Sequence, residues 1–181
     1  MLRYAIIDTA WGPFALVADG DTLVASYLPG LEDRLRPTLL DGWPGAEETP
    51  DLLPGLRAKI QSYFAGKRVD FKAKLDLSRL SSFQQTVLLA CQRIPYGQTA
   101  SYVDLARTAG RANAGRAVGG VMARNPMPLV IPCHRVVRRD GSLGGFSSPR
   151  GIEQKRRLLA LEGVVVSKDD KVCLQEDATS V

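Results

Sequence analysis

Histidine and cysteine are scarce in this chain, which has one histidine, His134, and three cysteines among its 181 residues. The cysteines, Cys91, Cys133 and Cys173, are odd in number and show no CxxC spacing. Disulfide scaffolds and cysteine-rich zinc modules need paired or clustered cysteines. The sequence therefore argues against both classes, and a reducing compartment fits the chain best.

The chain also lacks a long apolar run. No segment reaches the roughly 18 apolar residues that a membrane helix needs, and the first residues predict a strand rather than a signal peptide. We expect a cytoplasmic protein with no membrane partner. Its 24 Lys and Arg against 19 Asp and Glu give a net charge of +5, which favours a polyanionic partner.

The first half of the sequence is typical of a small α/β scaffold that ends near Leu77. Three strand-like runs (3–8, 14–18 and 22–27) are separated by turn sequences that suit an antiparallel meander. Residues 29–54 are rich in proline and glycine, so we expect mostly loop with one helical turn. A helix is expected from about Asp51 to Ala65, capped by Gly66.

The second half is predicted to be mostly helical. Ser82 and Gln85 suggest a capping box that starts a helix, and Cys91 falls on the apolar stripe of that helix, where a core thiol is expected. The remaining expected elements are a helix from Ser101 to Gly110, a helix from Asn113 to Arg124, a strand over 129–131, a turn at 139–141, a helix over 152–161 and a polar tail beyond Val166.

The helices before and after Gly110 have the layout of a helix-turn-helix, whose second helix docks on DNA. That second helix carries Arg116 and Arg124 but otherwise has very little side-chain bulk, with Ala117, Gly119 and Gly120 along it. Small residues let a backbone approach another surface closely. The surface can be a DNA duplex or the protein's own core, and both interpretations stay open on the residues alone.

The sole histidine directly follows Cys133, and both come after Pro132. A thiolate is the nucleophilic form of cysteine, and neighbouring imidazole or arginine groups lower the pKa of a thiol, so an activated sulfur is expected here. Adjacent side chains on a strand point to opposite faces, so contact between them requires a bend or a water. Pro132 favours such a bend. The dipeptide alone is equally compatible with a structural cysteine beside a surface histidine.

Several motifs agree in order and spacing with one known family. They are Phe83-Gln84-Gln85, Ile94-Pro95-Tyr96-Gly97, Ser101-Tyr102, Arg116-Ala117-Val118-Gly119, Asn125-Pro126, Ile131-Pro132-Cys133-His134-Arg135-Val136, Leu158-Leu159 and Glu162-Gly163. With these motifs the chain resembles the 6-O-alkylguanine-DNA alkyltransferases, strongly over residues 81–163 and more weakly over 1–77.

The resemblance implies a two-domain fold. An α/β, ribonuclease-H-like domain with a small antiparallel sheet and a helix is expected over residues 1–77. A mostly α domain with a winged-helix-like helix-turn-helix is expected over 78–166, followed by a tail over 167–181. A monomer without metal or organic cofactor is also implied, since the first domain lacks the cysteine and histidine ligands that some members use for zinc.

The implied activity is that of a methylated-DNA--[protein]-cysteine S-methyltransferase. Such proteins transfer an alkyl group from the 6-oxygen of guanine, and less readily from the 4-oxygen of thymine, irreversibly to their own cysteine. Cys133 matches the acceptor, His134 the residue that takes the thiol proton through a water, and Glu162 the carboxylate that orients the imidazole.

The resemblance also implies binding of double-stranded DNA through the minor groove, with the damaged base flipped out of the stack. Arg116 matches a finger that fills the gap, Tyr102 a phenol that donates to guanine N3, and Asn125 a hinge asparagine. Further DNA contacts are implied for Ser101, Ala117, Gly119, Gly120 and Arg124, and Ser147, Val136 and Phe146 are implied to line the substrate pocket.

Two departures from the family pattern concern that pocket. Phe146 stands where the family often has tyrosine, and the stretch 147–151 is about two residues longer than the common version. Two alternative functions remain. A non-enzymatic, base-flipping damage sensor would lack the acceptor cysteine, and a cysteine hydrolase would leave the helix of Arg116 without a role.

Overall fold

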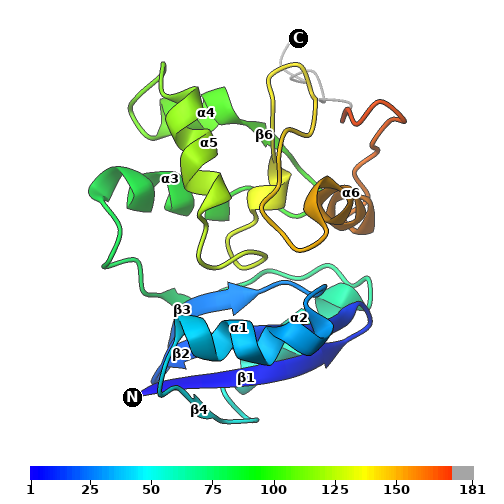
Figure 1. Cartoon of the computed structure of the whole chain (residues 1–181). Coiled ribbons are helices and arrows are strands. Elements are labelled where there is room, and N and C mark those ends of the chain that lie inside the picture. The colour runs from blue at the N-terminus through cyan, green and yellow to red at the C-terminus, as the bar shows by residue number, and fades with distance from the viewer. Residues whose placement is uncertain (173–181) are drawn as a thin grey trace.

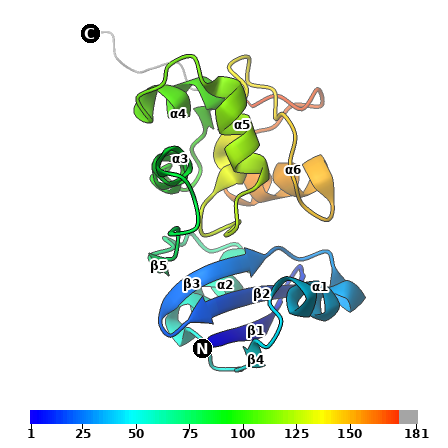
Figure 2. The ribbon, with the colours of Figure 1, turned by 60° about the vertical axis from the view of Figure 1, so that its left-hand side comes forward.

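The computed structural model describes residues 1–172, so Cys173 and the rest of the expected tail lie outside the described residues. The described chain forms two lobes, one built on a sheet and one built from helices (Figures 1 and 2). The chain crosses from one lobe to the other between β5 (Lys74–Leu75) and α3 (Ser82–Gln92). No helix within residues 1–172 is long and apolar enough to cross a bilayer.

The sheet lobe contains the expected antiparallel meander of β1 (Leu2–Thr9), β2 (Gly12–Asp19) and β3 (Thr22–Tyr27). Two short parallel strands, β4 (Glu47–Glu48) and β5, extend the meander at its two edges. Alternate residues of β2 enter different apolar clusters, as the two-residue period of a strand requires. The central strand is therefore buried on both faces.

A helix covers each face of this sheet. The expectation of a single helical turn in residues 29–54 is wrong, because a 3-10 turn (Glu32–Arg34) leads into α1 (Leu35–Gly42), whose Leu35 and Leu39 are buried on one face. α2 (Pro54–Phe64) packs on the other face and starts at a proline, slightly later than expected. Its last turn brings Tyr63 toward the helical lobe.

The helical lobe begins with a capping box one residue earlier than expected. Ser81 and Gln84, rather than Ser82 and Gln85, exchange hydrogen bonds at the start of α3, and the side chain of Gln85 instead donates to the carbonyl of Leu80. The lobe continues with β6 (Ala100–Ser101), α4 (Tyr102–Thr108), α5 (Gly115–Ala123), β7 (Val136–Val137) and α6 (Gly151–Leu161). The cap formed by Ser101 and Asp104 at the start of α4 is as expected.

The expected strand over residues 129–131 is wrong. Leu129 has a positive φ of 78°, and the amide of Ile131 donates to the carbonyl of Met127, so this apolar run forms a buried turn with only one isolated bridge. The strand of this region is β7, which pairs in parallel with β6. That pairing brings the segment after Cys133 beside the start of α4.

The two lobes share direct hydrogen bonds. The backbone amide and the hydroxyl of Ser26 donate to the carbonyls of Pro126 and Pro128 at 3.0 and 2.8 Å. The side-chain amide of Gln154 donates to the carbonyl of Pro29 at 2.6 Å. One continuous apolar cluster contains α2 together with α3, α4 and α5. The sheet lobe therefore forms the support against which the segment around Cys133 packs.

Candidate active site

Cys133, His134 and Arg135 form a single turn of 3-10 helix (Cys133–Arg135) that starts at Pro132. The bend expected at this proline is present. All three side chains are buried, and Cys133 is only 6% exposed. The turn directs the imidazole toward the end of α6, where Glu162 caps the helix.

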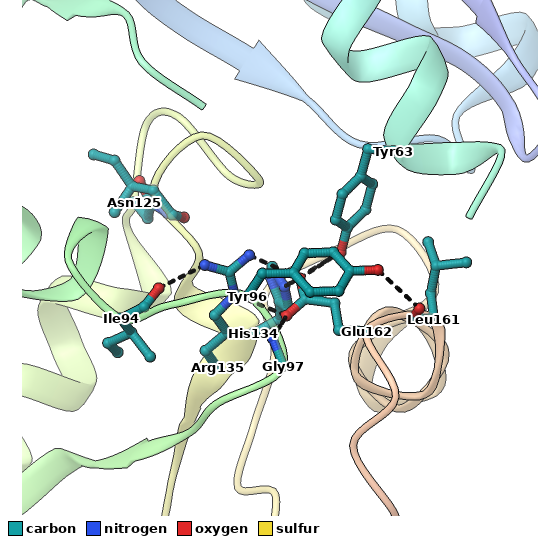
Figure 3. Close-up of polar contacts among 10 residues, drawn as sticks. Tyr63, Ile94, Tyr96, Gly97, Asn125, His134, Arg135, Leu161 and Glu162 are labelled. Atoms are coloured by element: carbon teal, nitrogen blue, oxygen red, sulfur yellow. Dashed lines mark hydrogen bonds and ion pairs between the residues drawn. The ribbon is translucent and has the colours of Figure 1, made fainter. Parts of the chain in front are cut away.

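The carboxylate of Glu162 accepts hydrogen bonds from both lobes (Figure 3). Its Oε1 accepts hydrogen bonds from His134 Nε2 at 2.7 Å, from the hydroxyl of Tyr63 at 2.7 Å and from Arg135 Nη2 at 3.0 Å. Its Oε2 accepts hydrogen bonds from Arg135 Nε at 2.8 Å and from the backbone amide of Gly97 at 3.1 Å. Gly97 has a φ of +77°, and a Cβ there would lie 3.0 Å from the carbonyl oxygen of Glu162. Only glycine fits at this approach.

These contacts define the protonation states. Burial alone would raise the pKa of Glu162, but the hydrogen bonds from His134 and Arg135, together with the charge of the guanidinium, hold it far below its usual range. An ionised carboxylate only accepts hydrogen bonds, so Nε2 of His134 carries a proton. Burial lowers the pKa of His134 despite Glu162, so the ring is neutral at pH 7 and Nδ1 carries its free lone pair. Within residues 1–172, buried Nδ1 has no hydrogen-bond partner.

The expectation of a lowered thiol pKa at Cys133 is wrong. Burial raises this pKa, while hydrogen bonding to Asn125 and the charge of Lys155 oppose the effect only in part. The neighbouring guanidinium of Arg135 is engaged by Glu162 and by the carbonyl of Ile94 at 2.6 Å. The arginines that neighbour Cys133 in the sequence therefore lower its pKa less than expected, because desolvation of the thiol is the larger effect.

A cavity of about 590 Å³ opens beside Cys133. It is lined by residues of α4, α5 and the 138–147 segment: Tyr102, Val103, Gly115, Arg116, Gly119, Met122, Ala123, Arg138, Arg139, Gly144, Gly145, Phe146 and Ser147. The volume lies in the range of small-molecule binding sites. Of the residues assigned to a substrate pocket from the sequence, Phe146 and Ser147 line this cavity, whereas Val136 is fully buried in β7 and is not among the lining residues.

α5 forms one wall of the cavity and also presents an exposed face. Val118, Val121 and Met122 are buried, whereas Arg116, Ala117 and Arg124 are exposed. A Cβ at Gly119 would meet nothing within 4 Å, and at Gly120 it would meet only the end of Arg124. Packing within the protein therefore does not require these glycines, so the open alternative of core packing does not explain them.

Two further sequence-assigned residues hold backbone in place. The side-chain amide of Asn125 donates to the carbonyl of Ile131 at 2.8 Å and accepts from the amide of Met127 at 3.0 Å. It thus ties the end of α5 to the segment before Cys133. Ser101 is buried, and its hydroxyl donates to Asp104 at 2.6 Å and accepts the amide of that residue at 3.1 Å.

Sequence reasoning missed Tyr63 and Lys155 as members of this region, and it took Arg135 for a charge beside the thiol rather than for the ion-pair partner of Glu162. Lys155 is fully buried, and its Nζ donates to the carbonyls of Val136 and Leu143 at 2.6 and 2.5 Å. Burial lowers its pKa to about 8. The sequence does contain a signal for Lys155 and Tyr63, because each lies on the apolar stripe of its helix. A lysine or tyrosine that is buried there needs a polar partner.

The fold and the site together define a class: a two-lobed protein whose helix-turn-helix borders a cavity holding a buried cysteine, supported by a histidine–glutamate pair. Family models match both lobes, the ribonuclease-like domain of 6-O-methylguanine DNA methyltransferase over residues 2–77 and its DNA binding domain over residues 82–164. The chain belongs to this family, and the resemblance seen in the sequence is confirmed.

Relatives agree over most of their length. The methylated-DNA--protein-cysteine methyltransferase of Mycobacterium tuberculosis is 38% identical over 90% of this chain and 93% of its own length. That of Methanosarcina acetivorans is 35% identical over 90% and 99%. The crystal structure of the Mycobacterium tuberculosis O6-methylguanine methyltransferase has a TM-score of 0.76 at 37% identity, covering 90% of this chain and 93% of the other. A structure of Mycobacterium tuberculosis OGT in complex with DNA has a TM-score of 0.75 at 35% identity, covering 89% and 93%.

Proposed function

We propose that this protein repairs DNA by moving a methyl or larger alkyl group from the 6-oxygen of guanine, and less readily from the 4-oxygen of thymine, to the sulfur of Cys133. One observation carries the proposal: the buried thiol of Cys133 lines the cavity beside α5. The next residue of the same turn is His134, which is hydrogen-bonded to Glu162. The activity is that of a single-use methylated-DNA--[protein]-cysteine S-methyltransferase.

The bond changes balance within the site. The sulfur forms a bond to the alkyl carbon as the carbon–oxygen bond to the purine breaks, and Nδ1 of His134 takes the thiol proton through a water. Tyr102 donates a proton to N3 of the departing purine, and burial raises the pKa of this phenol, which keeps it protonated beforehand. The product is a thioether without a good leaving group, so the protein acts once.

DNA binding is assigned to α5 and the start of α4. The exposed Arg116, Ala117 and Arg124 together with Gly119 and Gly120 form a face with little bulk, which suits close contact with a minor groove. Arg116 borders the cavity and takes the place of the flipped base. Ser101 is buried and contributes through the cap that it gives to α4.

The remaining assignments follow the same family pattern. We assign residues 1–77 to a scaffold domain, 78–166 to the DNA-binding and alkyl-acceptor domain, and 167–181 to a tail. The protein is proposed to act in the cytoplasm as a monomer. The proposed reaction requires no cofactor, since His134 activates the nucleophile.

The test is an intact-mass measurement after incubation with an excess of duplex containing 6-O-methylguanine. We expect one added methyl per chain, located on the peptide of Cys133. Cys133→Ala should lose the uptake and keep DNA binding, and Cys91→Ala, which removes a core thiol outside the cavity, should keep both.

Other outcomes identify the alternatives. Repeated turnover on an ester would favour a cysteine hydrolase. DNA binding without any methyl uptake by the wild-type chain would favour a damage sensor, and the acceptor thiol at position 133 argues against that function.

A further inference from the structure

One side chain of the first lobe reaches the catalytic groups of the second. Tyr63, in the last turn of α2, is fully buried, and its hydroxyl donates to Oε1 of Glu162 at 2.7 Å. The same hydroxyl lies 3.5 Å from Nε2 of His134. Figure 3 shows the phenol directed at the carboxylate from the side of the sheet lobe. Glu162 is 99 residues away in the sequence.

The phenol is fixed in place and stays protonated. Its ring packs against Phe64, Phe71 and Tyr96, with centroid distances of 5.4, 5.5 and 6.1 Å. Burial, followed by the charge of Glu162, raises the pKa of Tyr63 well above its ordinary value. The hydroxyl is therefore a permanent donor, and packing alone would have been achieved equally well by phenylalanine.

We propose that Tyr63 is a positioning residue of the transfer reaction, through which the sheet lobe sets the orientation and basicity of His134. The inference rests on the proposed function, since it assigns a task within that reaction. Tyr63 acts through Glu162 and does not touch the substrate cavity.

A single carboxylate oxygen links Tyr63 to the imidazole. Oε1 of Glu162 accepts from Tyr63, His134 and Arg135 at once. A hydroxyl that donates to this oxygen draws electron density from the carboxylate, so the carboxylate stabilises the imidazolium less than it otherwise would. It also holds the carboxylate in the plane that Nε2 needs. Removing the hydroxyl should raise the pKa of His134 and loosen the ring.

Other groups around the imidazole set the background for this effect. Glu162 and Lys155 approach from α6, and Arg135 and Cys133 belong to the same turn as the histidine. None of them changes in the substitution Tyr63→Phe. A matched control exists in Tyr96→Phe, because Tyr96 also loses one phenol hydrogen bond, to the carbonyl of Leu161 at 3.0 Å, without touching the carboxylate.

The first measurement is the rate constant of methyl transfer from a methylated duplex as a function of pH. Transfer needs the neutral imidazole, so the rate falls on the acid side of the pKa of His134. In Tyr63→Phe we expect the midpoint of this fall to move up by roughly one pH unit, with a rate at neutral pH lowered about tenfold through lost orientation. Both variants should bind DNA as the wild type does, and the pH–rate profile of Tyr96→Phe should match that of the wild type.

The second measurement does not depend on transfer. Because the chain has a single histidine, nitrogen-15 NMR of a protein without a histidine tag reports the pKa and tautomer of His134 directly. The neutral ring should carry its proton on Nε2, and its pKa should be higher in Tyr63→Phe than in the wild type or in Tyr96→Phe.

Three results would overturn the inference: superimposable profiles of Tyr63→Phe and the wild type, equal shifts in both tyrosine variants, or a wild-type ring protonated on Nδ1. The last result is obtained from the wild-type chain, so it does not depend on how well a variant folds. A wild-type chain that accepts no methyl group would instead overturn the proposed function, while the NMR comparison would still decide the role of Tyr63.

Discussion

Replacing Glu162 with glutamine removes the charge at the centre of the active site and keeps its shape. The side chain of Arg135 is 7% exposed and makes its ion pair with this carboxylate. A guanidinium does not lose its proton in a protein, so Arg135 stays charged when its partner becomes neutral, whereas His134 is neutral already. Breaking a buried ion pair on one side costs about 3–5 kcal/mol.

Urea unfolding at neutral pH measures this cost. With a slope of about 2 kcal/mol per molar urea, the midpoint should fall by roughly 2 M. Methyl transfer should also slow by about 10- to 100-fold, because the imidazole loses its orienting partner. The matched control is Glu153→Gln on the same helix. Glu153 is 64% exposed and lies 3.8 Å from Arg156, so it should cost less than about 0.5 kcal/mol.

A double variant tests whether the unpaired guanidinium causes the loss. In Arg135→Met with Glu162→Gln no buried charge is left without its partner, so the double variant should be more stable than the sum of the two single effects predicts, by about 2 kcal/mol. Additive effects, or a single-variant loss near that of the Glu153 control, would refute the reasoning.

Three other predictions concern groups around the cavity. Because burial raises the pKa of Cys133, its alkylation by iodoacetamide, followed on its own peptide, should be slow at neutral pH and keep rising above about pH 9; a plateau near pH 7 would contradict this. The pKa of Lys155 is lowered from 10.5 to about 8, so between pH 8 and pH 10.5 the unfolded chain keeps a proton on Lys155 that the folded chain has lost. The stability of the wild type relative to Lys155→Met should therefore rise by roughly 3 kcal/mol from pH 8 to 10.5, and a constant difference would argue against a buried ammonium. Arg116→Ala should slow transfer from duplex DNA about tenfold while sparing a single-stranded substrate, and equal losses on both would remove its role in base flipping.

Elements with strong local signals could be predicted from the sequence. The meander strands, the cap at Ser101 and the termination of α4 just before Gly110, which has a φ of +74°, depend on a few neighbouring residues. The capping box of α3 was placed one residue late because Ser81-Ser82 and Gln84-Gln85 give the same pattern in two registers. Residues 129–131 were apolar because they are buried, not because they form a strand.

The active site was predictable where residues are adjacent or matched a known motif, and not where the contacts are distant. Cys133, His134 and Glu162 came from the motif. Tyr63 meets Glu162 across 99 positions, and Arg135 meets it across 27, so no local pattern reveals either contact. The thiol pKa was predicted in the wrong direction because sequence gives the neighbouring charges but not the burial.

Burial acts in opposite directions on the two partners of the transfer reaction. It raises the pKa of the Cys133 thiol and lowers that of the His134 imidazole, so the neutral pair is favoured over a thiolate–imidazolium pair in the resting protein. A cysteine hydrolase needs a reactive thiolate on every cycle and lowers its thiol pKa to obtain one. A protein consumed by a single alkylation benefits from the reverse, because a resting thiol does not react with stray electrophiles. In the proposed transfer, charge develops only as the sulfur attacks a bound alkyl group, and we expect Glu162, kept ionised by its contacts with His134 and Arg135, to stabilise the imidazolium at that moment.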